Sequence, residues 1–179
     1  YLLGWPVDAT GAVNANPTDL SALETVRVSG IAGGAEATSR LSLSANLQSS
    51  QVVSAAAATY DAADPTQNMA SGAVTPDFQI PIQMYDSQGG LHTITFSFLK
   101  QGPNSWFAEI HLPEDQVSGG TGLVNGQLAT GVVNFTPFGQ LDAATSTLPL
   151  NVTVGETGSG GSEWDPALGL ATQTISLDM

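Results

Sequence analysis

The chain has 179 residues, of which 41% are hydrophobic and 11% charged, and its net charge is −13. This apolar content and length allow a buried core and exclude a disordered chain. Lys and Arg together number three against sixteen Asp and Glu, which excludes a basic surface for nucleic acid or for anionic membranes. Because cysteine is absent, disulfides, thiolate nucleophiles and cysteine metal ligands are excluded too.

The N-terminal third gives mixed local signals. Within NPTDLSALETV (16–26), Asp19 can cap a short helix over Leu20 to Thr25. In SRLSLSANL, apolar and polar residues alternate as in a β-strand, with one face formed by Leu41, Leu43 and Ala45. The stretch 49–65 stays open between two interpretations, because its four consecutive alanines favour helix and its paired valines favour strand.

The clearest pattern runs from residue 78 to residue 112, where three alternating runs are separated by two turn signals. The first turn is DSQGG (86–90), in which Asp86 and Ser87 can bond backbone amides and Gly89 or Gly90 can take positive φ. The second is Gly102-Pro103-Asn104. Pro81 cannot donate a ladder hydrogen bond, so the first run is predicted to be an edge strand or to hold a bulge. The predicted core of this meander is Phe78, Ile80, Ile94, Phe96, Phe98, Trp106 and Ile110.

Alternation returns in shorter runs at 133–135, 148–154 and 171–177, and the Gly/Ser-rich stretch 155–163 is typical of a flexible linker. The sequence therefore predicts an all-β fold with two β domains. An outer barrel- or sandwich-like domain, residues 48–163, is inserted into a partly present inner domain, residues 1–47 and 164–179, whose two segments are expected to pair. Trp5 and Trp164 are expected at the joint. The chain is interpreted as a fragment of a longer protein.

Residues able to hold a metal ion are few. His92 and His111 lie in neighbouring predicted strands, but a zinc or iron site needs three or four ligands. Both are therefore interpreted as structural residues at strand ends that can be replaced at little cost. Asp61 and Asp64 lack the residue order of a calcium loop. We expect no metal site and no cofactor.

Catalytic patterns are equally weak. A serine nucleophile needs an activating base and a strained turn, and no such motif is present. A glycosidase needs two carboxylates at a defined separation. Sixteen carboxylates produce such pairs by coincidence, and the formal candidates are Asp86, Glu109, Glu114, Asp115 and Glu163. Trp106 is interpreted as a core residue and not as a platform for sugar stacking. We expect no enzyme and no catalytic residues.

The stretch YDSQGGLHTITFSFLKQGPNSWFAEI resembles the signature meander of bacterial flagellar hook proteins. The positions that match the pattern of that family are Tyr85, Asp86, Ser87, Gly89, His92, Thr93, Phe98, Lys100, Asn104 and Trp106. Three further stretches are similar to hook-protein segments in the same order, namely YLLGWPVDATGAV, SRLSLSANLQSSQ and VNFTPFGQLDAAT. Together the four stretches span most of the chain.

The resemblance implies a mechanical function. Hook subunits assemble helically into a short curved tube outside the cell, a universal joint that transmits motor torque to the filament. The implied partners are other copies of the hook protein, together with the hook cap, rod and hook–filament junction proteins. Terminal helical segments would organise the tube, so a piece without them is expected to be monomeric. The alternative is a secreted carbohydrate-binding or adhesin-type β-sandwich, which shares the acidity and the Ser/Thr-rich surface.

Overall fold

The computed structural model describes residues 3–5, 13, 16, 19–25, 34–118, 120, 122–156 and 161–178. The chain divides into two compact units, residues 1–34 and residues 35–179. In the first unit, β1 (Leu3–Gly4) pairs antiparallel with β2 (Glu24–Thr25). The Asp19 side chain accepts a hydrogen bond from the Ser21 amide at 3.0 Å and caps the 3₁₀ turn η1 (Leu20–Ala22). The predicted cap is confirmed, whereas the predicted helix to Thr25 is wrong because its last residues pair as a strand.

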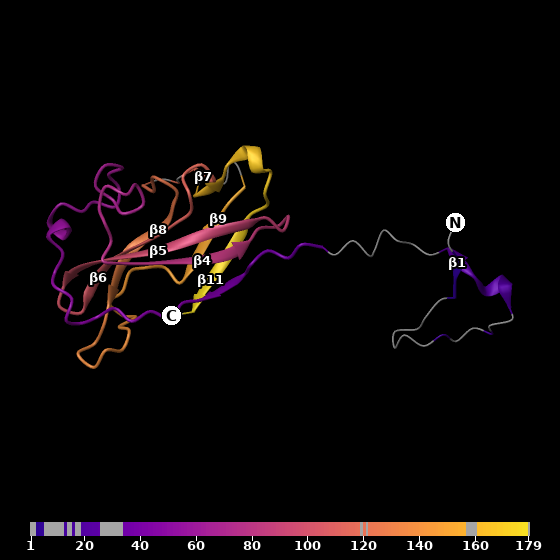
Figure 1. Cartoon of the computed structure of the whole chain (residues 1–179), viewed down its shortest axis with the longest axis horizontal. Helices are drawn as coiled ribbons and strands as arrows, with labels where there is room; N and C mark the ends of the chain where they lie inside the picture. Colours follow the sequence, from indigo (N-terminus) through magenta and orange to yellow (C-terminus); the bar gives the residue numbers. More distant parts are fainter. Residues whose placement is uncertain are drawn as a thin grey trace. The chain divides into compact units, whose positions relative to one another are not determined.

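The second unit is built on a four-stranded antiparallel meander. Its strands are β4 (Phe78–Tyr85), β5 (Leu91–Gly102), β6 (Ser105–His111) and β8 (Gln127–Asn134), in the order β4-β5-β6-β8. Figure 1 shows these long strands running together. The edge position of β4 confirms the prediction from Pro81, which pairs with Thr95. Both predicted turns are present, with positive φ at Gly89 (84°) and at Asn104 (55°).

A three-stranded sheet of order β3-β11-β9 lies against one face of the meander. It contains β3 (Arg40–Ser42), β9 (Asn151–Val154) and β11 (Gln173–Asp178), and β11 pairs parallel with β3 and antiparallel with β9. The short strands β7 (Val117–Ser118) and β10 (Glu163–Trp164) pair with each other, and the described part of the unit also contains the 3₁₀ turns η3 (Ala55–Ala58) and η4 (Pro166–Leu168). The predicted all-β fold is confirmed. No helix in the described part of the chain is long and apolar enough to cross a lipid bilayer.

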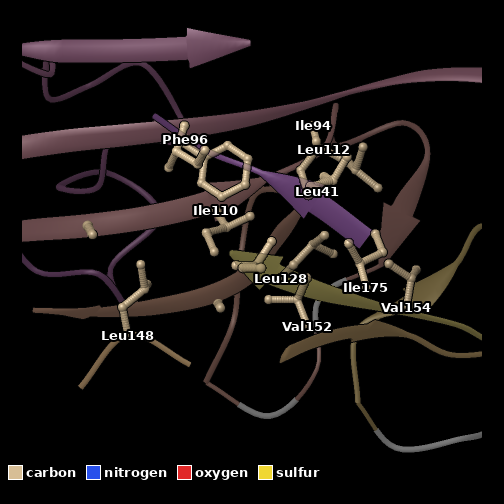
Figure 2. Packing of buried hydrophobic residues seen from close by; sticks show 14 of the residues in the cluster. Leu41, Ile94, Phe96, Ile110, Leu112, Leu128, Leu148, Val152, Val154 and Ile175 are labelled. Atoms are coloured by element: carbon tan, nitrogen blue, oxygen red, sulfur yellow. The ribbon is translucent and has the colours of Figure 1, made fainter. Parts of the chain in front are cut away.

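The main core lies between the two sheets. Figure 2 shows Phe96, Ile110 and Leu112 from the meander side facing Val152, Val154 and Ile175 of the smaller sheet. Of the predicted core residues, five are fully buried and two, Phe78 and Ile80, are partly buried against the same cluster. The two partly buried residues belong to the edge strand, which has a neighbour on one side only.

The opposite face of the meander is covered as well, by the excursion of residues 51–77 that precedes β4. Leu99 is fully buried there together with Met69 and Val74, and Phe107 packs against them. The ambiguous stretch 49–65 contains only the turn η3 and is otherwise irregular. A second, smaller hydrophobic cluster therefore fixes an irregular segment onto the sheet.

The predicted domain boundaries fall inside the second unit. Strands β3 and β11, one from each predicted inner-domain segment, do pair, and their residues Leu41 and Leu177 share one core with Ile94. Trp164 is buried in this unit, whereas Trp5 lies in the first. The assignment of 1–47 and 164–179 to an inner domain of a longer protein stays a prediction.

The predicted linker 155–163 is fixed at its two ends. Gly155 donates a backbone hydrogen bond to Ser162 at 2.7 Å, and the Ser162 hydroxyl donates to the Gln127 carbonyl at 2.9 Å. Residues 157–160 lie outside the described part. The prediction of a flexible linker is therefore wrong for the two ends of this stretch, because their backbone groups are hydrogen-bonded within the fold.

Candidate functional site

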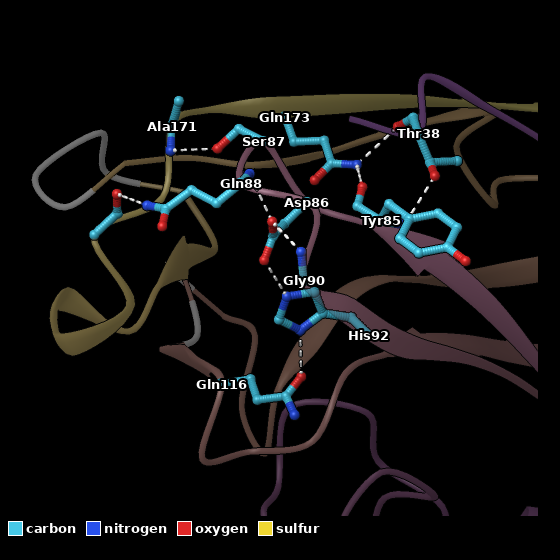
Figure 3. Close-up of polar contacts among 11 residues, drawn as sticks. Thr38, Tyr85, Asp86, Ser87, Gln88, Gly90, His92, Gln116, Ala171 and Gln173 are labelled. Atoms are coloured by element: carbon cyan, nitrogen blue, oxygen red, sulfur yellow. Dashed lines mark hydrogen bonds and ion pairs between the residues drawn. The ribbon is translucent and has the colours of Figure 1, made fainter. Parts of the chain in front are cut away.

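The hook-like motif forms a buried polar group at the tip of the β4–β5 hairpin (Figure 3). One carboxylate oxygen of Asp86 accepts hydrogen bonds from the amides of Gln88 at 2.7 Å and Gly90 at 2.8 Å. The other lies 2.7 Å from Nε2 of His92, and Nδ1 of His92 lies 2.9 Å from Oε1 of Gln116. A side chain at position 90 would collide with the Asp86 carboxylate, which explains the glycine there.

Electrostatics favour the ionised form of Asp86. Burial alone would raise the pKa of this carboxyl, but hydrogen bonds from His92, Gly90 and Gln88 outweigh burial and hold the pKa below its ordinary value. The prediction that Asp86 folds back onto backbone amides is confirmed. The prediction for Ser87 is wrong, because its hydroxyl accepts a hydrogen bond from the distant Ala171 amide at 3.3 Å.

The same tip is tied to the segment that leads into β11. Gln88 donates from its side chain to the Gly169 carbonyl at 3.0 Å. The Gln173 side chain donates to the carbonyls of Thr38 at 2.7 Å and Tyr85 at 3.0 Å. The hairpin, the segment before β3 and the start of β11 are thereby held together (Figure 3).

An Asp–His pair belongs to many catalytic centres, but this one is arranged for structure. In a catalytic triad the second ring nitrogen faces a nucleophile. Here Nδ1 of His92 faces the side-chain amide of Gln116, and the ring packs on buried Trp164 with centroids 4.9 Å apart. His92 is only 8% exposed. Its predicted place at a strand end holds, but its contacts imply that replacing it is costly, contrary to the expectation from sequence.

Glu109 is a second buried polar centre, on the face of the meander covered by residues 51–77. Its carboxylate is fully buried and accepts hydrogen bonds from the Tyr60 hydroxyl at 2.8 Å and from the amides of Met69 at 3.0 Å and Ala70 at 2.8 Å. From the sequence alone, Glu109 is only one of several formal candidates for a catalytic acid. A signal was available, since a charged residue in the middle of a strong strand must be paired when it is buried.

Lys100 holds the chain on both sides of the excursion, at residues 48–49 just before it and at Asp77, its last residue. The Lys100 ammonium donates to the carbonyls of Ser49 at 2.6 Å and Gln48 at 3.4 Å, and it lies 5.0 Å from the centre of the Trp106 ring. The carboxylate of Asp77 accepts a hydrogen bond from the Lys100 amide at 2.8 Å. The matched Lys and Trp of the motif are therefore packing partners.

The remaining candidate residues are exposed or partly buried and lie apart from these two centres. Asp61 and Asp64 accept hydrogen bonds from amides of their own loop, and His111 lies in β6 with its Nε2 3.4 Å from the Ser97 hydroxyl. Glu114 and Asp115 are exposed. Glu163 pairs with Ser118 in the β10–β7 ladder. Among the residues that the structure describes, no three His, Asp or Glu side chains are grouped so that they could hold a metal ion.

Comparison with known proteins decides the family. The model of the flagellar basal body protein FlaE D2 domain matches residues 46–179. The chain belongs to the FlaE D2 domain family. The resemblance of the motif to hook proteins is thus confirmed, and the FlaE D2 match includes every residue of the Asp86–His92 and Glu109 centres.

Individual relatives agree with the FlaE D2 assignment. The chain is 33% identical over 140 residues to the flagellar hook protein FlgE of Caulobacter vibrioides, which covers 68% of this chain and 23% of that protein. It also matches a solved 32 kDa fragment of the flagellar hook protein FlgE from Caulobacter crescentus. That match has a TM-score of 0.54 and 32% identity, and it covers 67% of this chain and 44% of the fragment. The chain spans about a quarter of the length of the curated hook protein.

Proposed function

We propose that this chain is the outer part of a flagellar hook subunit, a structural protein whose copies assemble into the curved tube that passes motor torque to the filament. The observation that carries the proposal is the FlaE D2 match over 46–179, together with 33% identity to a hook protein. Its place would be outside the cell, in the hook of the flagellum. The adhesin-type alternative has no comparable support.

The buried polar groups fit a load-bearing role. Asp86, Glu109 and Lys100 each bind backbone groups of irregular segments and fix those segments to the sheets. Buried, charge-assisted hydrogen bonds of this kind are stronger than neutral ones and restrict the fold to one arrangement. A subunit that transmits torque has to resist local deformation. We therefore propose that these groups hold the fold rigid and that the chain is not an enzyme.

The partners follow from the same proposal. Other copies of the hook protein would surround the chain, and the hook cap, rod and hook–filament junction proteins would adjoin the ends of the tube. The acidic charge does not suit nucleic acid or an anionic membrane surface. In isolation at low concentration, 179 residues with a net charge of −13 should remain monomeric, since like-charged copies repel each other.

Immunogold electron microscopy tests the proposal. Antibodies raised against the 179-residue chain should label the short curved segment between the cell envelope and the filament of the source bacterium. Deleting the gene should remove both that segment and the labelling, and a plasmid copy should restore them. Label spread over the cell surface, with intact hooks in the deletion strain, would favour the adhesin-type alternative and overturn the proposal.

A further inference from the structure

Phe138 is the most exposed of the large hydrophobic residues of the described chain, with 91% of its surface accessible. It lies at the tip of a hairpin that is closed by pairing of Phe135 with Leu141 and by a 2.8 Å hydrogen bond from the Thr136 amide to the Gln140 carbonyl. Gly139, with φ of 80°, allows the tight turn. The ring is thus presented to solvent on an ordered support, which lowers the entropy cost of binding.

An apolar hollow of about 170 Å³ lies at the base of the same hairpin. Its apolar lining consists of Leu43, Ala45, Leu47, Phe98, Val133, Phe135 and Leu141. An apolar cavity of about 150 Å³ is large enough to bind benzene, so the hollow can take a phenyl ring. Phe138 of the same chain does not fill it, because that ring is almost fully exposed.

Apart from Phe98 of β5, the residues that line the hollow come from two segments that are free of charge. No Asp, Glu, Lys, Arg or His occurs from Leu41 to Tyr60, nor from Gln116 to Leu141, although the chain carries sixteen carboxylates. The adjacent Asp142 is engaged in its own turn, where its carboxylate accepts from the Ala144 amide and the Thr145 hydroxyl. Two copies of net charge −13 can approach each other on such a face without bringing many carboxylates together. A basic partner would instead gain more from the acidic remainder of the surface.

We propose that Phe138 of one copy enters this hollow on a second copy. The inference rests on the proposed function, since it names a contact between subunits of the polymer. One aromatic side chain buries about 150–250 Å², whereas a stable interface buries about 1,200–2,000 Å². The contact is therefore weak by itself. It forms where a polymer or a high concentration brings copies together, and such a contact can break and reform.

A dilution series followed by NMR of the ¹⁵N- and ¹³C-methyl-labelled chain tests the contact, from micromolar up to about 1 mM. Concentration-dependent shifts are expected at Phe138 and at the lining residues, such as Leu43 and Val133. Two variants test the two halves of the contact separately. Phe138→Ser removes the ring that enters the hollow, and Ser44→Phe adds a ring at an exposed position on the rim of the hollow. Each should weaken self-association at least about tenfold.

Val52→Ser is the matched control, because Val52 is 79% exposed and does not line this hollow. It should leave the shifts unchanged. The proposal is overturned if the wild-type chain shows no concentration-dependent shifts on this face, if Phe138→Ser retains them, or if the hollow responds to added oligosaccharides and not to a second copy. Because immunogold labelling of hooks does not depend on this face, hook labelling together with absent shifts would reject the contact and leave the proposed function intact.

Discussion

The hydroxyl of Tyr60 donates a hydrogen bond of 2.8 Å to the carboxylate of Glu109, 49 residues further along the chain. Burial, and then the Glu109 charge, raise the pKa of Tyr60 well above its ordinary value, so the hydroxyl keeps its proton. With the Met69 and Ala70 amides also bound to Glu109, one carboxylate fixes two distant points of the 51–77 excursion.

Replacing Glu109 with Ala should therefore destabilise the fold by about 3 kcal/mol, because it leaves buried donors without an acceptor. Tyr60→Phe should cost about 1.5 kcal/mol, since only one hydrogen bond to a charged group is lost. Chemical denaturation measures both values, and Glu114→Gln, at an exposed position, is the control. Hydrogen exchange should rise at Met69 and Ala70 in the Glu109 variant. Equal stability of Glu109→Ala and the control would show that the excursion is held by other contacts.

The Asp86–His92 contact should give the fold an acid-sensitive component. The folded-state pKa of Asp86 lies below the unfolded value of about 3.9. The ionised carboxylate therefore adds its full share to the free energy of unfolding above about pH 3.9, and this share is lost as the pH falls through the folded-state pKa. Asp86→Asn should lower stability at pH 7 and flatten the decline below pH 4. Urea titrations between pH 2.5 and 7 measure the effect.

Asp115→Asn, at an exposed position, controls for the loss of one charge. His92→Gln should also destabilise at pH 7, since Asp86 loses a buried partner. An Asp86→Asn profile that runs parallel to the wild-type profile would contradict this account.

His111 should titrate below its ordinary value. Burial lowers the pKa of its ring more than the nearby Glu109 charge and the Leu112 backbone raise it. The folded-state pKa lies below the unfolded value of about 6.5. The neutral ring of His111 therefore adds its full share to the free energy of unfolding above about pH 6.5, and this share declines as the pH falls through the folded-state pKa. An NMR titration of the ring protons should give a midpoint below 6.5, and His111→Gln should remove this part of the pH dependence. A midpoint at or above 6.5 would contradict the prediction.

Trp106 should be among the costliest residues to truncate. It is 1% exposed, meets Phe78 edge-on with ring centroids 5.4 Å apart, and lies beneath the Lys100 ammonium. Trp106→Ala should destabilise by roughly 3–5 kcal/mol in chemical denaturation. Phe138→Ala is a matched truncation of an exposed aromatic residue and should change the stability by less than about 0.5 kcal/mol. A decrease in the free energy of unfolding of less than about 1 kcal/mol for Trp106→Ala would mean that the core repacks and fills the space left by the indole ring.

The meander could be predicted because its information is local. Alternation in β5 places His92 and Ile94 on the face that packs against the smaller sheet, and the two turn signals lie where the chain reverses. Pro81 restricts β4 to an edge for a reason that needs no tertiary knowledge. Core and turn residues of this kind are selected by the geometry of their own strand.

The covering of the opposite face of the meander by residues 51–77 could not be predicted in the same way. Residues 51–77 have no periodicity, and their position depends on long-range contacts to the Glu109 side chain and to the backbone of Lys100. Leu99 and Phe107 carried a partial signal, because they are apolar on the side that alternation assigns to solvent. The apposition of Asp86 and His92 is a comparable case, since a six-residue separation becomes a contact only after the hairpin register is fixed.

The parallel pairing of β3 with β11 has a mechanical consequence. These are the first and last strands of the unit 35–179, and they point in the same direction, with Ser176 donating to Ser39 at 2.9 Å and Leu43 donating to Asp178 at 2.8 Å. A tensile load that pulls residue 35 away from residue 178 is directed along both strands. It shears the ladder, so several hydrogen bonds must rupture together, whereas antiparallel ends in a hairpin would unzip one bond at a time.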